Sequence, residues 1–290
     1  MKVDHSSLST TIIFLNRGDE TLFQGTGFFY TREEKGYSVV CLVTNYHVLT
    51  GYPPMTANPP KGDNIIFQFH LSDQETGRVR TIQFPIFNIH QKPVWLTSST
   101  CPESDLAIIP LAHVLFDGCH VYSISKQFER QQDLLIVRPG MSITLVGYLH
   151  GRYDTKNSLP IWKTGSIASE PYVDFGGKPS FMVDASIFPG MSGSPAFALS
   201  STWETEKGQI VGGANIKKFM GILASGWIED EKRYLEEVMS EPRLGFIEKK
   251  SLEIGVIWKA NLISELIYSF DVDKYVVEIS NNIRWKILES

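Results

Sequence analysis

The sequence predicts an all-β protein built from two consecutive antiparallel β units. Short apolar segments rich in Val, Ile, Phe and Tyr dominate the chain, and Gly, Pro, Asn and Asp bound them. No strand–helix–strand alternation is visible, which argues against a parallel sheet. The strand pattern breaks near residues 112–125, so we expect an N-terminal unit over 1–120 and a C-terminal unit over 121–290.

In the N-terminal unit, each expected strand is an apolar segment that ends at a turn signal. The polar stretch RGDE separates the first two strands, and the charged stretch REEKG separates the second from the third. A Pro-rich loop, GYPPMTANPPKGD, precedes the fourth. The expected strands are 10–16, 21–31, 37–45, 64–71, 80–89 and 105–111.

The C-terminal unit repeats the strand pattern and adds two expected helices. Residues 228–240 have helical composition with Pro242 beyond them, and 260–270 carry apolar residues at helical spacing. The first helix is expected as a surface insertion that could dock a regulatory partner. The expected strands of this unit are 133–137, 142–149, 160–169, 180–186, 194–199, 219–227 and 253–260.

Composition and charge limit the possible partners. The chain has 290 residues, a formal net charge of −5 and no basic run, so we expect no nucleic-acid partner. The apolar run from Ile12 to Leu15 is too short for a signal peptide core, and no segment approaches the ~18 apolar residues of a spanning helix. We therefore expect no contact with a membrane.

The three cysteines predict a reducing environment. Their number is odd and the spacing of Cys41, Cys101 and Cys119 fits no metal motif. Secreted domains of this kind more often carry paired cysteines. We expect buried, reduced thiols in a cytoplasmic protein, with no metal and no cofactor.

Three segments carry residues suited to nucleophilic catalysis. LVTNYHVLTG places His47 just after an apolar strand, ESDLAIIPL places Asp105 before another, and PGMSGSP supplies Ser192. A serine hydroxyl is a weak nucleophile at neutral pH, so it needs a base and a group that orients the base. Singly, each residue has an ordinary structural explanation; the order His, Asp, Ser favours a catalytic triad. Glu103 and Asp184 are weaker alternatives for the acid.

Taken together, these segments resemble a trypsin-like (chymotrypsin-fold) serine protease, of the bacterial intracellular type without a peptide-binding accessory domain. The resemblance implies two consecutive antiparallel six-stranded β-barrels with a C-terminal helix, and active-site residues on both barrels. The rival α/β-hydrolase elbow has the order Ser, acid, His and is excluded. The segments that carry the resemblance are GTGFF (25–29), LVTNYHV (42–48), SDLAIIPL (104–111), PGMSGSPAF (189–197), FMGILASG (219–226) and EIGVIWKANLISELI (253–267).

The resemblance implies a serine endopeptidase that acts on a protein or peptide substrate through an acyl-enzyme. Ser192 is then the nucleophile, His47 the base and Asp105 the orienting acid, while the N–H groups of Gly190 and Ser192 form the oxyanion hole. Met191 stands where zymogen-type relatives carry an acid, so we expect no activation by N-terminal trimming. Two alternatives stay open, a non-catalytic binding module on this scaffold and a protease that a partner must activate.

The resemblance also implies a substrate pocket with uncharged walls. Burying Arg or Lys against such walls is unfavourable, so we expect a small or medium uncharged residue on the acyl side of the cut bond. Asp184 is the one open alternative, because its carboxylate would favour a basic residue if it turned inward. Many relatives have a serine at the position of Ala224, where it supports the aspartate. The expected pocket residues are Ser186, Ile187, Ala224, Ser225, Gly226 and Gly255.

Overall fold

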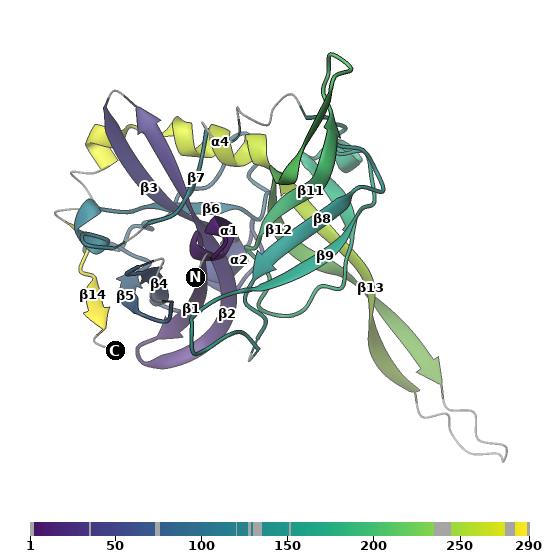
Figure 1. The fold of residues 1–290 in the computed structure, drawn as a ribbon. Coiled ribbons are helices and arrows are strands. Elements are labelled where there is room, and N and C mark those ends of the chain that lie inside the picture. Colours follow the sequence, from purple (N-terminus) through teal and green to yellow (C-terminus); the bar gives the residue numbers. More distant parts are fainter. Residues whose placement is uncertain are drawn as a thin grey trace, which may run out of the picture.

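In the computed structural model of the protein, two β units lie side by side (Figure 1). The residues that the structure describes are 3–34, 36–72, 76–119, 121–126, 129, 135–150, 152–234, 245–275 and 282–288. Among them, no helix is long and apolar enough to cross a membrane.

The N-terminal unit is an eight-stranded sheet in the order β14-β5-β4-β1-β2-β3-β6, with β7 paired to β2. Its antiparallel hairpins follow from the turn-bounded apolar segments of the sequence. The strands are β1 (Thr10–Arg17), β2 (Glu20–Glu34), β3 (Tyr37–Thr44), β4 (Asn64–His70), β5 (Val79–Pro85), β6 (Ala107–Pro110), β7 (Ile124–Ser125) and β14 (Lys286–Leu288).

The C-terminal unit is a closed barrel in the order β10-β13-β12-β11-β8-β9. Closure pairs every strand on both sides and leaves no open edge. The strands are β8 (Ser142–Gly147), β9 (Ile161–Ile167), β10 (Ser180–Asp184), β11 (Pro195–Glu204), β12 (Ile210–Tyr234) and β13 (Gly245–Lys259).

Helices are few and short. The α-helices with described bounds are α1 (His5–Leu8), α2 (Tyr46–Thr50) and α4 (Ala260–Ser269), and the 3₁₀ turns among the described residues are η1 (His113–Leu115) and η2 (Phe175–Gly177). The expected C-terminal helix is therefore confirmed as α4. In Figure 1, α4 lies across the N-terminal sheet, next to β3 and β7.

The predicted chymotrypsin-like arrangement is confirmed, with one difference in the N-terminal unit. This unit has eight strands rather than six, because the chain contributes β7 and β14 from beyond residue 120. β7 runs parallel to β2 at Tyr30 and Thr31, and β14 pairs with β5 near the C-terminus. A single cut after residue 120 therefore does not separate the two units.

The expected helix over 228–240 is wrong for the residues that the structure describes. Residues 228–234 continue β12 and pair with 245–251 of β13, while 235–240 lie outside the described residues. The register sets Glu229 opposite Lys250 and Asp230 opposite Lys249. This backbone pairing is a non-local contribution that outweighs helix propensity. In Figure 1, the paired segment projects from the barrel as a long arm.

Three clusters of buried apolar residues form the cores of the fold, and one of them joins the two units. It combines Phe28 and Tyr30 of β2 with Phe219 of β12 and with Ile263 and Ile267 of α4. The rings of Phe28 and Phe219 meet edge to face with centroids 5.7 Å apart. α4 therefore packs its apolar face into a core that both units build.

Candidate active site

His47 lies on α2, directly after the end of β3. Asn45 is the N-cap residue of this helix, and Gly51 ends it in the left-handed conformation, with φ of 75°. The next residue, Val48, packs so closely on Gly25 that a Cβ on that glycine would meet it at 2.7 Å. A short capped turn, seated on β2, thus fixes the position of His47.

Asp105 precedes β6 and holds His47 at two points. Its Oδ1 accepts the backbone N–H of His47 at 3.0 Å, and its Oδ2 lies 2.5 Å from Nδ1 of the imidazole. Asn45 Nδ2 also donates to the carbonyl oxygen of Asp105 at 2.6 Å. The side chains of His47 and Asp105 are 32% and 15% exposed. The imidazole is therefore oriented through Nδ1, which leaves Nε2 available. Neither Glu103 nor Asp184 hydrogen-bonds to it.

Ser192 lies in a tight turn that requires glycine at positions 190 and 193. Gly190 and Gly193 have φ of 92° and 91°. A Cβ on Gly190 would lie 2.5 Å from the carbonyl oxygen of Tyr148, and one on Gly193 would lie 1.8 Å from that of Thr26. The glycine-rich sequence thus allows the turn to press against both neighbouring backbones.

The two serines of this turn have different surroundings. Ser194 is fully buried, and its hydroxyl donates to the carbonyl oxygen of Met191 at 2.6 Å. Ser192 is partly exposed, and its hydroxyl makes no hydrogen bond among the described residues. Ser194 is therefore committed to holding the turn, whereas the Ser192 hydroxyl is available.

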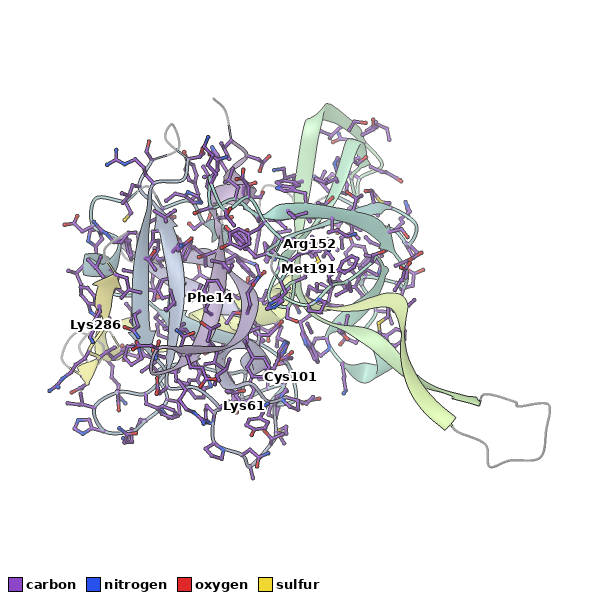
Figure 2. All side chains as sticks on the ribbon, turned by 90° about the horizontal axis from the view of Figure 1, so that it is seen from below. Phe14, Lys61, Cys101, Arg152, Met191 and Lys286 are labelled. Carbon is purple, nitrogen blue, oxygen red and sulfur yellow. The ribbon has the colours of Figure 1, made fainter. Side chains whose placement is uncertain are left out.

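The turn docks on the unit that carries His47. The backbone N–H of Thr26 donates to the carbonyl oxygen of Ser192 at 2.8 Å. Thr44, three residues before His47, donates its hydroxyl to the carbonyl oxygen of Thr26 at 2.7 Å. His47 and Ser192 make no direct hydrogen bond to each other, which is common before substrate binds. Figure 2 labels Met191 where the barrel faces the N-terminal sheet.

The amides expected to form an oxyanion hole make no internal hydrogen bond. Among the described residues, neither Gly190 N–H nor Ser192 N–H has an acceptor, whereas the N–H of Met191, between them, donates to Phe188 at 3.2 Å. Two unpaired amides beside a partly exposed hydroxyl can bind an anion that develops on a substrate carbonyl.

The expected pocket residues Gly255 and Ser186 both have close neighbours in the structure. Gly226 and Gly255 are paired across β12 and β13, but Gly255 does not leave an open wall, because a Cβ there would meet Ile187 Cδ1 at 2.2 Å. Ser186 Oγ donates to a carboxylate oxygen of Glu253 at 3.2 Å. Ser225 and Gly226 belong to β12, and their side-chain environment lies outside the described residues.

A cavity of about 500 Å³ adjoins the acid of the site. Asp105 and Ala224 both line it, together with Glu103. The methyl group of Ala224 gives Asp105 no hydrogen bond at this face, in agreement with the expected departure from relatives that carry serine. His47 is thus the only described side chain bonded to the Asp105 carboxylate.

Sequence reasoning missed three residues at the site. Glu253 has a φ of 58°, unusual for a residue other than glycine, and places a carboxylate at Ser186. Thr26 and Thr44 hold the serine turn. GTGFF was recognised only as part of a family segment, and nothing in the sequence pattern pairs it with the distant turn.

In the described part of the chain, no group of three or more His, Cys, Asp or Glu side chains is placed to hold a metal ion.

The fold and site define a trypsin-like serine protease. The chain matches the trypsin-like peptidase domain family over residues 25–204, more than half of its length, and it belongs to this family. Its substrates are accordingly peptides.

Solved structures resemble the chain at low identity. The protease Anisep from Arthrobacter nicotinovorans is 15% identical with a TM-score of 0.47, covering 92% of this chain and 96% of that one. A serine endoprotease from Yersinia pestis is 13% identical with a TM-score of 0.45, covering 96% and 68%. The inactive form of the Rv3671c protease, a protein of M. tuberculosis, is 14% identical with a TM-score of 0.44, covering 91% and 89%. No curated protein matches the chain significantly.

Proposed function

We propose that this protein is a serine endopeptidase that cuts peptide bonds through an acyl-enzyme, with Ser192 as nucleophile, His47 as base and Asp105 as orienting acid. The observation that carries the proposal is that the Asp105 carboxylate makes two hydrogen bonds to His47. One, of 3.0 Å, is to the backbone N–H, and the other, of 2.5 Å, is to Nδ1. An ionised Asp105 keeps the proton on Nδ1, so the lone pair of Nε2 is free to accept another.

The reaction follows from these roles. Ser192 Oγ attacks the substrate carbonyl carbon while Nε2 of His47 takes the hydroxyl proton. The carbonyl oxygen becomes an oxyanion, which the N–H groups of Gly190 and Ser192 bind. The imidazolium then gives its proton to the leaving amine, and an ester to Ser192 remains. Water, deprotonated by His47, attacks that ester. The imidazolium then returns the proton to Ser192 Oγ as the ester bond breaks and the acid product leaves.

Met191 supports activity without N-terminal trimming. Its side chain is fully buried and packs in the apolar core of the barrel. An uncharged thioether in that core offers no partner to a newly formed α-amino group. The turn beside Ser192 is therefore held by packing and by its own hydrogen bonds rather than by an ion pair.

A fluorophosphonate probe, which reacts with activated serines, tests the nucleophile. We expect the wild-type protein to label and to cleave a peptide library, and Ser192→Ala to lose both while its melting temperature is kept. Loss of a triad member leaves only about 10³–10⁴-fold catalysis over water. Ser99→Ala, at an exposed serine of the N-terminal unit, is the control, and it should still label. Cleavage by Ser192→Ala at the wild-type rate would show that the nucleophile is misassigned.

A partner-activated protease is the second candidate, and the absence of a direct hydrogen bond between His47 and Ser192 favours it. Labelling in the presence and absence of cell extract separates the candidates. Labelling of the protein alone supports the endopeptidase, and labelling only with extract supports activation by a partner. Absence of labelling in both conditions supports a binding module without catalysis.

A further inference from the structure

Thr26 makes two hydrogen bonds to the serine turn, although it has no role among the assigned catalytic residues. We propose that Thr26 is a positioning residue, whose hydroxyl holds in place the peptide group that lies between the two backbone amides assigned to the oxyanion. The inference rests on the proposed function and adds to it a residue on the N-terminal unit that shapes the turn of the C-terminal barrel.

Both hydrogen-bonding capacities of the Thr26 hydroxyl are used. It donates to the carbonyl oxygen of Gly190 at 2.8 Å and accepts the backbone N–H of Tyr148 at 2.9 Å. Thr26 is fully buried, so water cannot replace either bond. The hydroxyl therefore ties Gly190 to the end of β8 through a single oxygen atom.

The backbone of Thr26 holds the other end of the turn. Its N–H donates to the carbonyl oxygen of Ser192 at 2.8 Å, and its own carbonyl oxygen accepts the Thr44 hydroxyl at 2.7 Å. Thr26 thus binds the carbonyl groups on both sides of Met191. The segment between those two carbonyls contains the amide of Ser192, and the amide of Gly190 lies immediately before it.

Each carbonyl from Pro189 to Ser192 is held by a donor. The N–H of His150 donates to Pro189 at 2.9 Å, and Met191 accepts both the N–H of Ser194, at 3.0 Å, and its hydroxyl. In a trans peptide the C=O and N–H point in opposite directions, so a held carbonyl aims the N–H of its own peptide group away from the donor. The hold on Pro189 aims the Gly190 amide in this way, and the hold on Met191 aims the Ser192 amide. The Thr26 hydroxyl holds the peptide group between them, whose N–H belongs to Met191.

Among the carbonyl groups from Pro189 to Ser192, that of Gly190 is the one whose hydrogen bond comes from a side chain alone. Glycine with φ of 92° has wide conformational freedom, so the peptide group that follows it depends on its hydrogen bonds. These are the 2.8 Å bond from the Thr26 hydroxyl to its carbonyl and the longer 3.2 Å bond from its Met191 N–H to Phe188. Backbone N–H groups donate to the carbonyl oxygens of Pro189 and Ser192. A backbone N–H also donates to the carbonyl oxygen of Met191, in addition to the Ser194 hydroxyl. Replacing the Thr26 hydroxyl therefore frees Gly190 O and removes the acceptor of the Tyr148 N–H. The peptide group between the two amides can then shift and displace both of them.

The test compares Thr26→Val, which keeps the shape and removes the hydroxyl, with Thr26→Ser, which keeps the hydroxyl. We expect Thr26→Val to lower kcat by about tenfold or more with little change in KM, since outright loss of one oxyanion donor costs about 10²–10³. It should also weaken a peptide boronic acid, which forms a tetrahedral adduct on Ser192, by a similar factor, while binding of the matching product peptide stays constant. Thr26→Ser should retain kcat.

Thr11→Val is the matched control for lost stability. The Thr11 hydroxyl is also buried, donates to the Gln68 carbonyl oxygen at 3.0 Å and accepts the Gln68 N–H at 2.9 Å, within the same sheet and away from the turn. We expect Thr11→Val to lower the melting temperature and keep kcat. Equal kcat values for Thr26→Val and Thr11→Val, in a wild type that labels and cleaves, would overturn the positioning role.

Failure of the proposed function gives a different result, because the wild type itself would neither label nor cleave. If Thr26→Val does not fold, Thr26→Cys is compared with Thr26→Ser by the same readouts, since a thiol is a weak donor of similar size. A fall in kcat for the cysteine variant supports the proposal. Wild-type kcat in that variant, or loss of the fold in both, would mean that Thr26 is only structural.

Discussion

At the residue scale, Asp105 fixes both the ring and the backbone of His47. It accepts one hydrogen bond from the His47 ring and one from the His47 backbone, while Asn45 holds its carbonyl oxygen. Position and tautomer of the imidazole therefore depend on the same carboxylate. Ala224, which lines the same cavity, contributes no hydrogen bond to it.

Asp105→Asn should keep the fold and lose the reaction. The amide can still accept the backbone N–H of His47, but its NH₂ group would donate to Nδ1 and leave the proton on Nε2. In comparable triads this change lowers kcat by about 10⁴. Steady-state cleavage and the rate of fluorophosphonate labelling measure the loss. A variant with wild-type kcat would contradict the assigned role of Asp105.

The pocket around Ser186 predicts cleavage after small or medium uncharged residues. Ile187 fills the space over Gly255, and this favours the small end of that range. The carboxylates of Asp184 and Glu253 are exposed to solvent, where an ion pair gains little, so neither offsets the burial of a cation. Profiling with a mixed peptide library tests the prediction.

Glu253→Gln is the matched variant for this pocket, since it keeps the size of the side chain and removes the charge. We expect its cleavage profile to remain that of the wild type. Dominant cleavage after Arg or Lys in the wild type, lost in Glu253→Gln, would show instead that Glu253 selects basic residues. The same profile persisting in Glu253→Gln and lost in Asp184→Asn would assign that selection to Asp184.

At the scale of elements, α4 is the part of the C-terminal half that stabilises both units. Its buried face, which includes Ile263, Leu266 and Ile267, packs into the core shared by β2, β3 and β12. The helix is too short to be stable alone, so its structure depends on this packing.

Ile263→Ala should destabilise the whole protein rather than the helix alone. Ile263 is fully buried, and truncation of a buried isoleucine to alanine costs about 2–5 kcal/mol. Urea unfolding followed by circular dichroism and by tryptophan fluorescence measures the free energy. Glu265→Ala, on the exposed face of α4, is the control and should change it little. A loss below about 1 kcal/mol for Ile263→Ala would contradict a tightly packed joint core.

For the whole molecule, the three cysteines are free in the structure. Burial raises the pKa of the Cys41 thiol to about 12, and it also raises the pKa values of Cys101 and Cys119. Thiols with raised pKa values are mostly protonated at neutral pH and therefore react slowly. The fold thus depends on packing and hydrogen bonds rather than on covalent links.

Activity and melting temperature should be insensitive to thiol reductants. Loss of a native disulfide typically costs about 2–5 kcal/mol, so a structural bridge would reveal itself as a marked fall in melting temperature. Scanning calorimetry with and without dithiothreitol measures the difference. Such a fall would contradict the prediction that all three thiols are reduced.

The sequence by itself determined the fold class, the C-terminal helix and the candidate triad. These depend on local signals: strand-like segments, the spacing of apolar residues over 260–270, and short motifs around His47, Asp105 and Ser192. Such signals can be read within a few residues, because backbone preferences and turn chemistry act locally.

Only the tertiary structure decided what joins distant segments. It made 228–234 a strand through pairing with 245–251, and it distinguished the available hydroxyl of Ser192 from the committed one of Ser194. It also brought Thr26 to Gly190, which lies 164 residues further along the chain. The contact between Thr26 and Gly190 forms only after the two β units pack together, and the strand at 228–234 requires its pairing partner in the barrel, so no local sequence pattern contains either.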